Sequence, residues 1–88
     1  MGDLSELGKT LFVGRELLIG DESSEALCVL VGVSLPTLRR YIRQLCVMGC
    51  SIVSVRTAAG WVYRIENPNQ VRERLCLWLD LERTRSLL

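Results

Sequence analysis

The sequence predicts a small, mostly helical α+β fold made of three helices, a β-hairpin and an additional C-terminal helix. The length of 88 residues suits one small domain with a modest core. Apolar residues recur at helical spacing through the first half of the chain, between glycine breaks at positions 20, 32 and 49. Two segments rich in β-branched residues then flank a short turn. We therefore expect residues 1–66 to form the domain and residues 67–88 the added helix.

The first two helices are predicted from apolar spacing and from helix-ending residues. In the first segment the residues at the spacing of one helix face are Leu4, Leu7, Leu11, Phe12 and Leu18. The Gly20-Asp21-Glu22 sequence breaks this helix. Ser23 or Ser24 can then cap a short helix over residues 25–31, which Gly32 ends.

A third helix over residues 34–48 is predicted to turn its arginines away from the core. Ser34 can cap this helix and Pro36 fits its first turn, while Gly49 ends it. At about 100° per residue, the core side holds Leu38, Ile42 and Leu45, with Tyr41 at its edge. The opposite arc holds Pro36, Thr37, Arg39, Arg40, Arg43, Gln44 and Val47. No acid on this helix pairs with the three arginines, so we expect them to be kept for an anionic partner.

The hairpin is predicted from a change in composition after the third helix. The segments CSIVSVR and WVYRI are rich in β-branched and aromatic residues, and Thr57-Ala58-Ala59-Gly60 joins them. Trp61 and Tyr63 are expected in the core, because strand aromatics opposite a helix usually pack there. Base stacking is the alternative role for these two side chains.

The C-terminal helix is predicted to carry more apolar surface than one small domain covers. It starts at Asn69, after Pro68, and one face holds Val71, Leu75 and Trp78. A second stripe, Leu77 and Leu81, would form an exposed patch of the kind that marks an interface. We expect a homodimer through Leu77, Trp78 and Leu81. The alternative is that these leucines pack on helix 25–31 of the same chain.

Charge is distributed unevenly along the chain. Residues 1–25 hold six acids and two bases, residues 26–65 hold five arginines and no acid, and residues 66–88 hold four of each. An acid-free stretch of this length in a chain otherwise rich in acids indicates a surface that faces a polyanion. Chance placement of five solvated arginines is the alternative. The arginines of the last segment alternate with acids and are assigned no ligand.

The composition argues against an enzyme, a metal site and a cofactor. The chain has no histidine, no CxxC pair, no glycine-rich phosphate loop and no pair of carboxylates in an apolar context. The cysteines are expected to pack as small buried residues, at Cys28, Cys46, Cys50 and Cys76. A thiol- or metal-responsive role for Cys46 and Cys50 is the alternative.

The sequence also gives no sign of membrane insertion. No apolar run approaches the roughly 18 residues that a membrane span needs, and MGDLSELGK has acids where a secretory signal would have bases. We expect a cytoplasmic protein without membrane contact, associated with the nucleoid if it is bacterial.

The stretch SSEALCVLVGVSLPTLRRYIRQLCVMGCSIVSV, followed by AAGWVYRI, resembles the winged helix-turn-helix domains of DeoR-type regulators and of the biotin operon repressor. The shared pattern is a short helix ending in Gly-Val-Ser, then a Thr, an arginine-rich helix, a Leu and a Gly. This chain supplies it with Gly32, Val33, Ser34, Thr37, Arg39, Arg40, Leu45 and Gly49. The resemblance covers about residues 5–66.

The resemblance implies that helix 34–48 enters the major groove of duplex DNA and that the hairpin is the wing. The residues expected to meet DNA are Ser34, Pro36, Thr37, Arg39, Arg40, Arg43 and Gln44, with Arg56 and Arg64 beside the wing tip. Two features depart from the pattern. Residues 29–31 make the second helix unusually apolar, and the wing tip has no basic residue for minor-groove insertion.

The function expected from the sequence is sequence-specific binding of double-stranded DNA by a small transcriptional regulator that acts by occupancy. A rival interpretation is a winged-helix module that binds a protein partner within a larger assembly, with the arginines facing acids. The C-terminal helix or helix 25–31 would supply the apolar part of such a contact.

Overall fold

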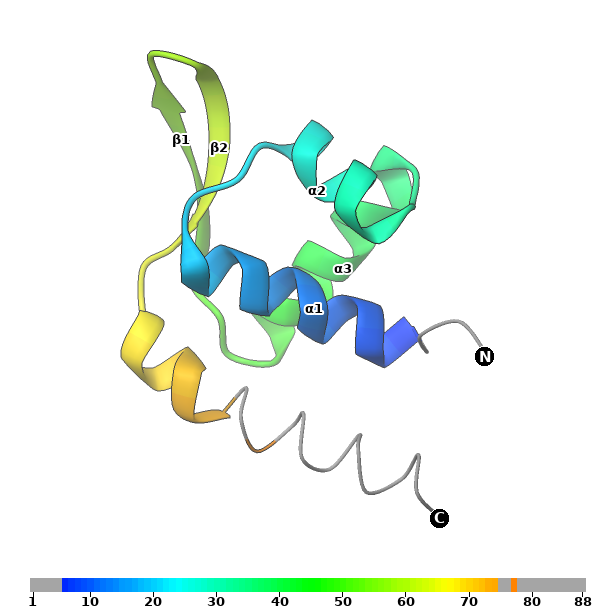
Figure 1. Ribbon diagram of the computed structural model, residues 1–88. Coiled ribbons are helices and arrows are strands. Elements are labelled where there is room, and N and C mark those ends of the chain that lie inside the picture. The colour runs from blue at the N-terminus through cyan, green and yellow to red at the C-terminus, as the bar shows by residue number, and fades with distance from the viewer. Residues whose placement is uncertain (1–5, 75–76, 78–88) are drawn as a thin grey trace.

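The computed structural model describes residues 6–74 and residue 77. Three helices come first, α1 (Glu6–Ile19), α2 (Ser24–Val31) and α3 (Leu35–Val47). Strands β1 (Ile52–Thr57) and β2 (Gly60–Ile65) follow as an antiparallel hairpin, and residues 68–74 are helical. Figure 1 shows the hairpin projecting from the packed helices. The described residues thus form the mostly helical α+β fold that the sequence predicts, with four helices and one hairpin.

The ends of α2 are set by the residues that the sequence singles out. The hydroxyl of Ser23 accepts a hydrogen bond from the Ala26 amide (3.1 Å), which satisfies a donor of the first turn. At the other end Gly32 has φ 73° and donates its amide to the Cys28 carbonyl. This left-handed conformation favours glycine, so Gly32 is the residue that ends α2.

Ser34 stands at the start of α3 as expected, but its side chain does not cap the helix. Ser34 occupies the N-cap position, but its hydroxyl forms no hydrogen bond with a backbone amide of α3. It donates instead to the Thr37 hydroxyl (3.1 Å), one turn further along the helix. The two hydroxyls therefore form a pair on the surface at the first turn of α3.

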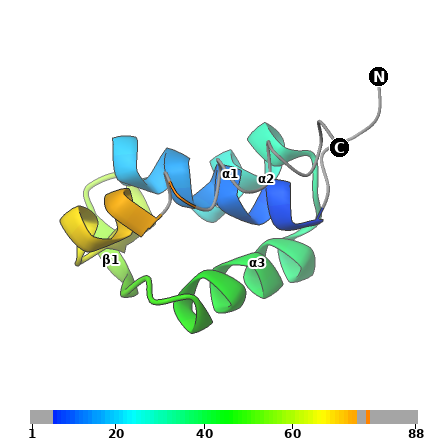
Figure 2. The same cartoon turned by 90° about the horizontal axis from the view of Figure 1, so that it is seen from below.

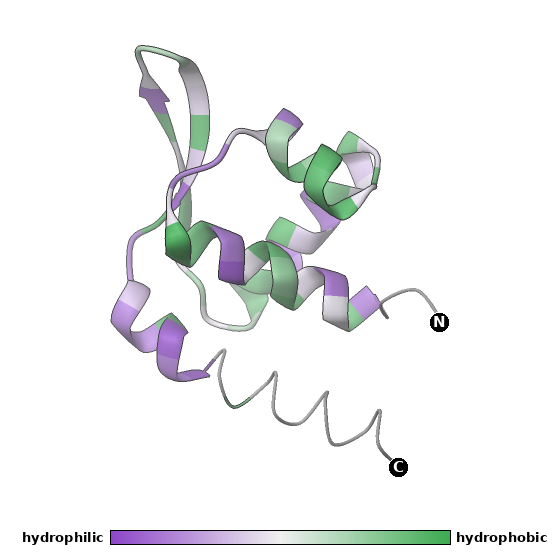
Figure 3. Cartoon of the chain, viewed as in Figure 1, coloured by the Kyte–Doolittle hydropathy of each residue, from purple (hydrophilic) through white to green (hydrophobic). Residues whose placement is uncertain are grey.

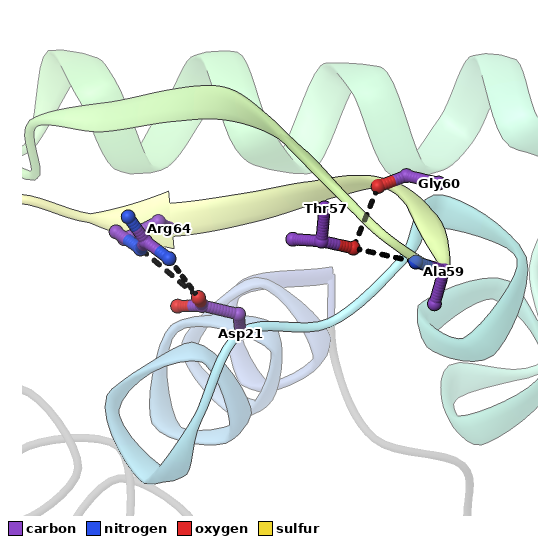
Figure 4. Close-up of polar contacts among 5 residues, drawn as sticks. All are labelled: Asp21, Thr57, Ala59, Gly60 and Arg64. Atoms are coloured by element: carbon purple, nitrogen blue, oxygen red, sulfur yellow. Dashed lines mark hydrogen bonds and ion pairs between the residues drawn. The ribbon is translucent and has the colours of Figure 1, made fainter.

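The hairpin turns over Ala58 and Ala59. The Thr57 hydroxyl accepts a hydrogen bond from the Ala59 amide (3.2 Å) and donates one to the Gly60 carbonyl (2.8 Å), as Figure 4 shows. Gly60 has φ 117°, a conformation that a side chain would strain. Cross-strand partners run from Thr57 and Gly60 at the turn to Ile52 and Ile65 at the base.

The core lies between the three helices and the base of the hairpin. Its largest fully buried side chains are Leu11, Val13, Leu27, Leu38, Leu45 and Val71. Of the predicted face of the first helix, Leu11 is fully buried and Leu18 packs against the core, whereas the prediction is wrong in part because Leu7 and Phe12 are only half-buried. Leu4 lies outside the described residues. Since α1 packs against α2, α3 and β2, its buried arc is wide and centres on small and branched residues, Gly8, Thr10, Leu11, Val13, Gly14 and Leu17.

The connection between α1 and α2 is hydrogen-bonded to β2, a pairing that the sequence did not predict. The Tyr63 amide donates to the Glu22 carbonyl (2.8 Å), and the Glu22 amide donates to the Tyr63 carbonyl (3.4 Å). Beside them, Asp21 accepts two hydrogen bonds from Arg64. The connection therefore pairs with β2 at one residue, Glu22, and holds the hairpin against the helices.

The C-terminal helix begins at residue 68, one position before the predicted start. Asn67 precedes it and accepts a hydrogen bond from the Ser51 amide (2.9 Å) while donating one to the Gly49 carbonyl (2.9 Å). The guanidinium of Arg74, one of the described residues of this helix, lies directly over Gly49. These contacts fix the helix start to the loop between α3 and β1, and Val71 is buried in the core.

Candidate functional site

The outer face of α3 carries the predicted arginine cluster. Figure 2 shows α3 on one side of the molecule, with α1 packed along its inner side. On the inner side Leu38, Tyr41, Ile42 and Leu45 are buried, so Tyr41 is a core residue and does not lie at an edge. The outer residues are exposed, apart from the half-buried Thr37, and they are Pro36, Arg39, Arg40, Arg43, Gln44 and Val47.

One of the three helix arginines has an acidic partner from another helix. The Nη2 atom of Arg40 lies 2.8 Å from Oε2 of Glu6, the first residue of α1. The expectation that all three lack a partner is therefore wrong for Arg40. It considered only acids on the same helix, whereas the packing of α1 on α3 brings Glu6 across. The Arg40 guanidinium also lies 5.7 Å from the ring centre of Tyr41.

Among the described residues, Arg39 and Arg43 lack the kind of acidic partner that Arg40 has in Glu6. Neither forms an ion pair with any residue that the structure describes, and both are exposed. They are four positions apart, so their side chains lie on one face of α3, one turn from each other. Two unpartnered guanidinium groups at this spacing form a compact positive site for oxyanions or for guanine edges.

Arg64, predicted to lie near the hairpin tip, occupies a different place. It pairs with Val53 across the hairpin, well away from the turn at Ala58. Its Nε and Nη2 atoms donate to one oxygen of Asp21 at 2.9 and 2.6 Å (Figure 4). The hydrogen bond from Arg64 lowers the pKa of the Asp21 carboxyl below its ordinary value. Arg64 therefore serves to attach the hairpin, and the prediction that it lies beside the tip is wrong.

Arg56 keeps its predicted position beside the hairpin tip, and its cross-strand partner is Trp61. The expectation that Trp61 packs in the core is wrong, because its side chain is 62% exposed. The register explains this, since Trp61 is one pair from the turn, where the hairpin projects away from the core (Figure 1). Tyr63, two residues nearer the base, is half-buried and packs against the core. Arg56 forms no ion pair within the described part of the chain.

A groove lies between the first half of α1 and the middle of α3. It has a volume of about 500 Å³ and is lined by Glu6, Leu7, Thr10, Arg40, Tyr41 and Gln44. The Tyr41 hydroxyl is buried and has no hydrogen-bond partner among the residues that the structure describes. Burial raises the pKa of this hydroxyl, and the negative charge of the nearby Glu6 raises it further. The groove is thus lined by the same Glu6–Arg40 pair that borders the arginine face of α3.

The described cysteines do not all occupy the expected buried positions. Cys50 is buried, Cys28 is half-buried and Cys46 is exposed, so the prediction is wrong for Cys46, which lies on the outer side of α3 near its end. Burial raises the pKa of the Cys50 thiol, which keeps that group protonated. Among the described residues no group of three potential ligands can hold a metal ion. Cys76 lies outside the described residues.

Comparison of the chain with protein-family models, with curated proteins and with solved structures finds no match. The candidate site is therefore defined by exposure, charge and pairing. Among the five arginines of residues 26–65, Arg39, Arg43 and Arg56 are exposed and have no ion pair with a described residue. No helix in the described part of the chain is both long and apolar enough to pass through a membrane.

Proposed function

We propose that this protein is a winged helix-turn-helix protein that binds double-stranded DNA sequence-specifically and acts by occupancy as a small transcriptional regulator. In this proposal α3 enters the major groove, α2 precedes it across a short turn, and β1 and β2 form the wing. The observation that carries the proposal is the outer face of α3, where Arg39 and Arg43 are exposed and have no acidic partner among the described residues.

The arrangement of elements supports this assignment. Three helices are followed by the hairpin, and an isolated bridge between Glu22 and Tyr63 ties the α1–α2 connection to β2. The turn between α2 and α3 contains only Gly32, Val33 and Ser34. Residues 26–65, which include α3, the hairpin and all of α2 except its first two residues, contain no acid. Arg39, Arg43 and Arg56 from this stretch are exposed and have no ion pair with a described residue, so they favour contact with a polyanion.

The side chains of α3 suit different parts of a DNA site. Arg39 and Arg43 can reach guanine edges or phosphates through their planar forks. Thr37 and Ser34, whose hydroxyls are hydrogen-bonded to each other, lie at the first turn where a phosphate contact fixes the register of the helix. Gln44 and Arg40 lie along the edge nearest to α1. An Arg40 contact to DNA would replace its exposed pair with Glu6, which is a weak competitor.

The test is a titration of the protein against a random-sequence duplex at two salt concentrations. Phosphate contacts give a steep loss of affinity as salt rises, because each contact releases condensed counterions. The double variant R39A/R43A should lose roughly 1–3 kcal/mol per base-reading arginine and should also show a shallower salt slope. Arg15→Ala, an exposed arginine of α1, is the matched control and should bind as the parent does.

Two results would contradict the proposal. One is an R39A/R43A variant that stays folded by circular dichroism and binds the duplex as tightly as the parent. The other is an affinity that does not change with salt, because no phosphate contact would then contribute. Selection of a preferred site from the random duplex pool tests the sequence-specific part separately.

An apolar surface on α2 favours a second candidate function, that of a module which binds a protein partner. Val29 is 82% exposed and Leu30 is 52% exposed. Figure 3 shows α2 as a largely hydrophobic element. Exposed apolar side chains on one helix often mark a protein contact. The substitution V29N/L30N distinguishes the two functions, since neutral polar side chains would weaken a partner contact there without adding negative charge near the proposed DNA contact of α3.

We further propose that the protein is a homodimer through its C-terminal helix. Leu77 is 60% exposed, as an interface residue of an isolated chain should be. The other two predicted interface residues, Trp78 and Leu81, lie outside the described residues, as does Leu75. A two-fold pair would read two half-sites about one helical turn apart, which a single domain cannot do.

A further inference from the structure

The hairpin carries an exposed aromatic side chain that major-groove binding by α3 does not use. The indole of Trp61 is 62% exposed, which is unusual for so large an apolar side chain. Burying it would remove a large apolar area from water, so leaving it exposed on a projecting hairpin favours a contact with a partner. Figure 1 shows that this hairpin extends beyond the helices.

The neighbours of Trp61 indicate what kind of partner fits. Arg56 is its direct cross-strand partner, so both side chains leave the hairpin on the same face. Arg56 is exposed and has no acidic partner among the described residues. A planar aromatic ring beside a free guanidinium suits a planar group that carries a negative charge close by. A nucleotide has both parts, a base that stacks and a phosphate that pairs with arginine.

A small hollow beside the indole adds polar groups. It has a volume of about 80 Å³ and is lined by Ser24, Ser54, Trp61, Val62 and Tyr63. Ser54 lies on the same hairpin face as Trp61, and Ser24 comes from the first turn of α2. Neither hydroxyl forms a hydrogen bond within the described part of the chain, so both can reach the edge of a base. The hollow therefore offers hydrogen bonds next to the stacking surface.

We propose that the hairpin face of Trp61 and Arg56 binds an unpaired base, so that the protein prefers DNA in which single-stranded nucleotides adjoin a duplex. This inference rests on the proposed DNA binding by α3 and adds the class of DNA to it. A paired base hides both of its faces in the stack, and only an unpaired base offers one to the indole. Arg56 pairs with the phosphate of the same nucleotide, and the α3 arginines hold the adjoining duplex.

The test compares two fluorescein-labelled DNAs by anisotropy. One is a blunt duplex, and the other is the same duplex with a short single-stranded overhang of mixed sequence. The parent should bind the overhang DNA at least about fivefold more tightly, the lower end of the range expected for one base stacked on an aromatic ring. Trp61→Ala should abolish this preference and leave the affinity for the blunt duplex within about twofold. Trp61→Phe should retain part of the preference, because it keeps an aromatic ring.

Two controls distinguish the stacking role from a general loss of apolar surface. Val29→Ala truncates another exposed apolar side chain, on α2, and should keep the preference of the parent. Circular dichroism of each variant confirms that the fold is intact. The fluorescence of Trp61, taken as the difference between parent and Trp61→Phe, should be quenched by the overhang DNA and not by the blunt duplex.

The outcomes separate this inference from the function on which it rests. Equal affinity of the parent for the two DNAs, or a preference that survives in Trp61→Ala, overturns the inference and leaves duplex binding by α3 intact. Binding to neither DNA overturns both. A Trp61→Ala variant that loses blunt-duplex affinity as strongly as overhang affinity also overturns the inference, because Trp61 would then contact the duplex itself.

Discussion

The guanidinium of Arg40 on α3 and the carboxylate of Glu6 on α1 are joined by a hydrogen bond of 2.8 Å at the edge of the arginine face. Both side chains are well exposed, so the pair adds little to the stability of the fold. Its effect on an approaching polyanion is larger. Glu6 cancels the charge of Arg40 and places a negative charge next to the surface that we propose for DNA.

Glu6→Gln should therefore raise the affinity for duplex DNA. The substitution removes one negative charge beside the proposed interface and frees Arg40 for a phosphate, and a gain of about 1 kcal/mol or less is expected at low salt. The measurement is duplex affinity at two salt concentrations, with a steeper salt slope expected for the variant. Glu73→Gln, an equal change in net charge on the C-terminal helix, should leave the affinity near that of the parent. An unchanged Glu6→Gln affinity would mean that Arg40 makes no contact with DNA.

The Asp21–Arg64 pair should make the stability of the fold depend on pH. Arg64 lowers the pKa of Asp21 in the folded protein, so the pair stabilises the fold above the unfolded pKa of about 4. This stabilisation is lost as the pH falls through the folded pKa. Asp21→Asn should therefore lower the urea midpoint at neutral pH, and the difference from the parent should shrink in acid. An equal difference at both pH values would show that charge pairing at Asp21 does not contribute.

Gly49→Ala should destabilise the fold more than Gly20→Ala. Gly49 has φ 111°, and a β-carbon there would collide with the guanidinium of Arg74. The expected loss is about 1–3 kcal/mol in the free energy of unfolding. At Gly20 a β-carbon meets open space, so that variant is the matched control and should stay within about 0.5 kcal/mol of the parent. The Arg74 guanidinium is the end of a flexible, exposed side chain and can move aside, so adding Arg74→Ala to Gly49→Ala should recover little of the loss, which comes from the positive φ.

Leu77→Glu together with Leu81→Glu should convert the proposed dimer to a monomer. A charge on each leucine would have to be buried at the interface without a partner, which costs several kcal/mol. Sedimentation velocity at micromolar concentration measures the change. Leu30→Glu, which places the same charge on α2, tests whether that exposed apolar surface is the interface instead. A parent protein that is monomeric throughout would leave the dimer without support.

The helix boundaries were predictable because local residues set them. Ser23 and Gly32 limit α2 through hydrogen bonds within their own turn, and Gly60 completes the hairpin turn through its positive φ. Such interactions span only a few positions, so the sequence pattern contains them. The apolar spacing of α3 predicted its buried side for the same reason, because a single helix period fixes which residues share a face.

The pairing of charges was not predictable in this way. Glu6 and Arg40 are 34 positions apart, and Asp21 and Arg64 are 43 apart, so only the packed fold brings them together. A count of charge along the chain treated all five arginines of residues 26–65 as equivalent. The fold divides them into two that attach elements of the molecule to each other and three that remain unpaired. The exposure of Trp61 was missed because residue type indicates a preference for burial, whereas its distance from the helices depends on the register of the hairpin.

The attachment of the hairpin to the α1–α2 connection has a consequence for the order of folding. Strands β1 and β2 can pair early, because a two-residue turn closes them at little entropic cost. The contacts of Asp21 and Glu22 with β2 close a loop of the chain that contains α2 and α3, so they join residues about 40 positions apart and cost more chain entropy than the hairpin turn. The pairing of Arg56 with Trp61 needs only the local turn, whereas the orientation of the hairpin against the helices depends on this long-range closure.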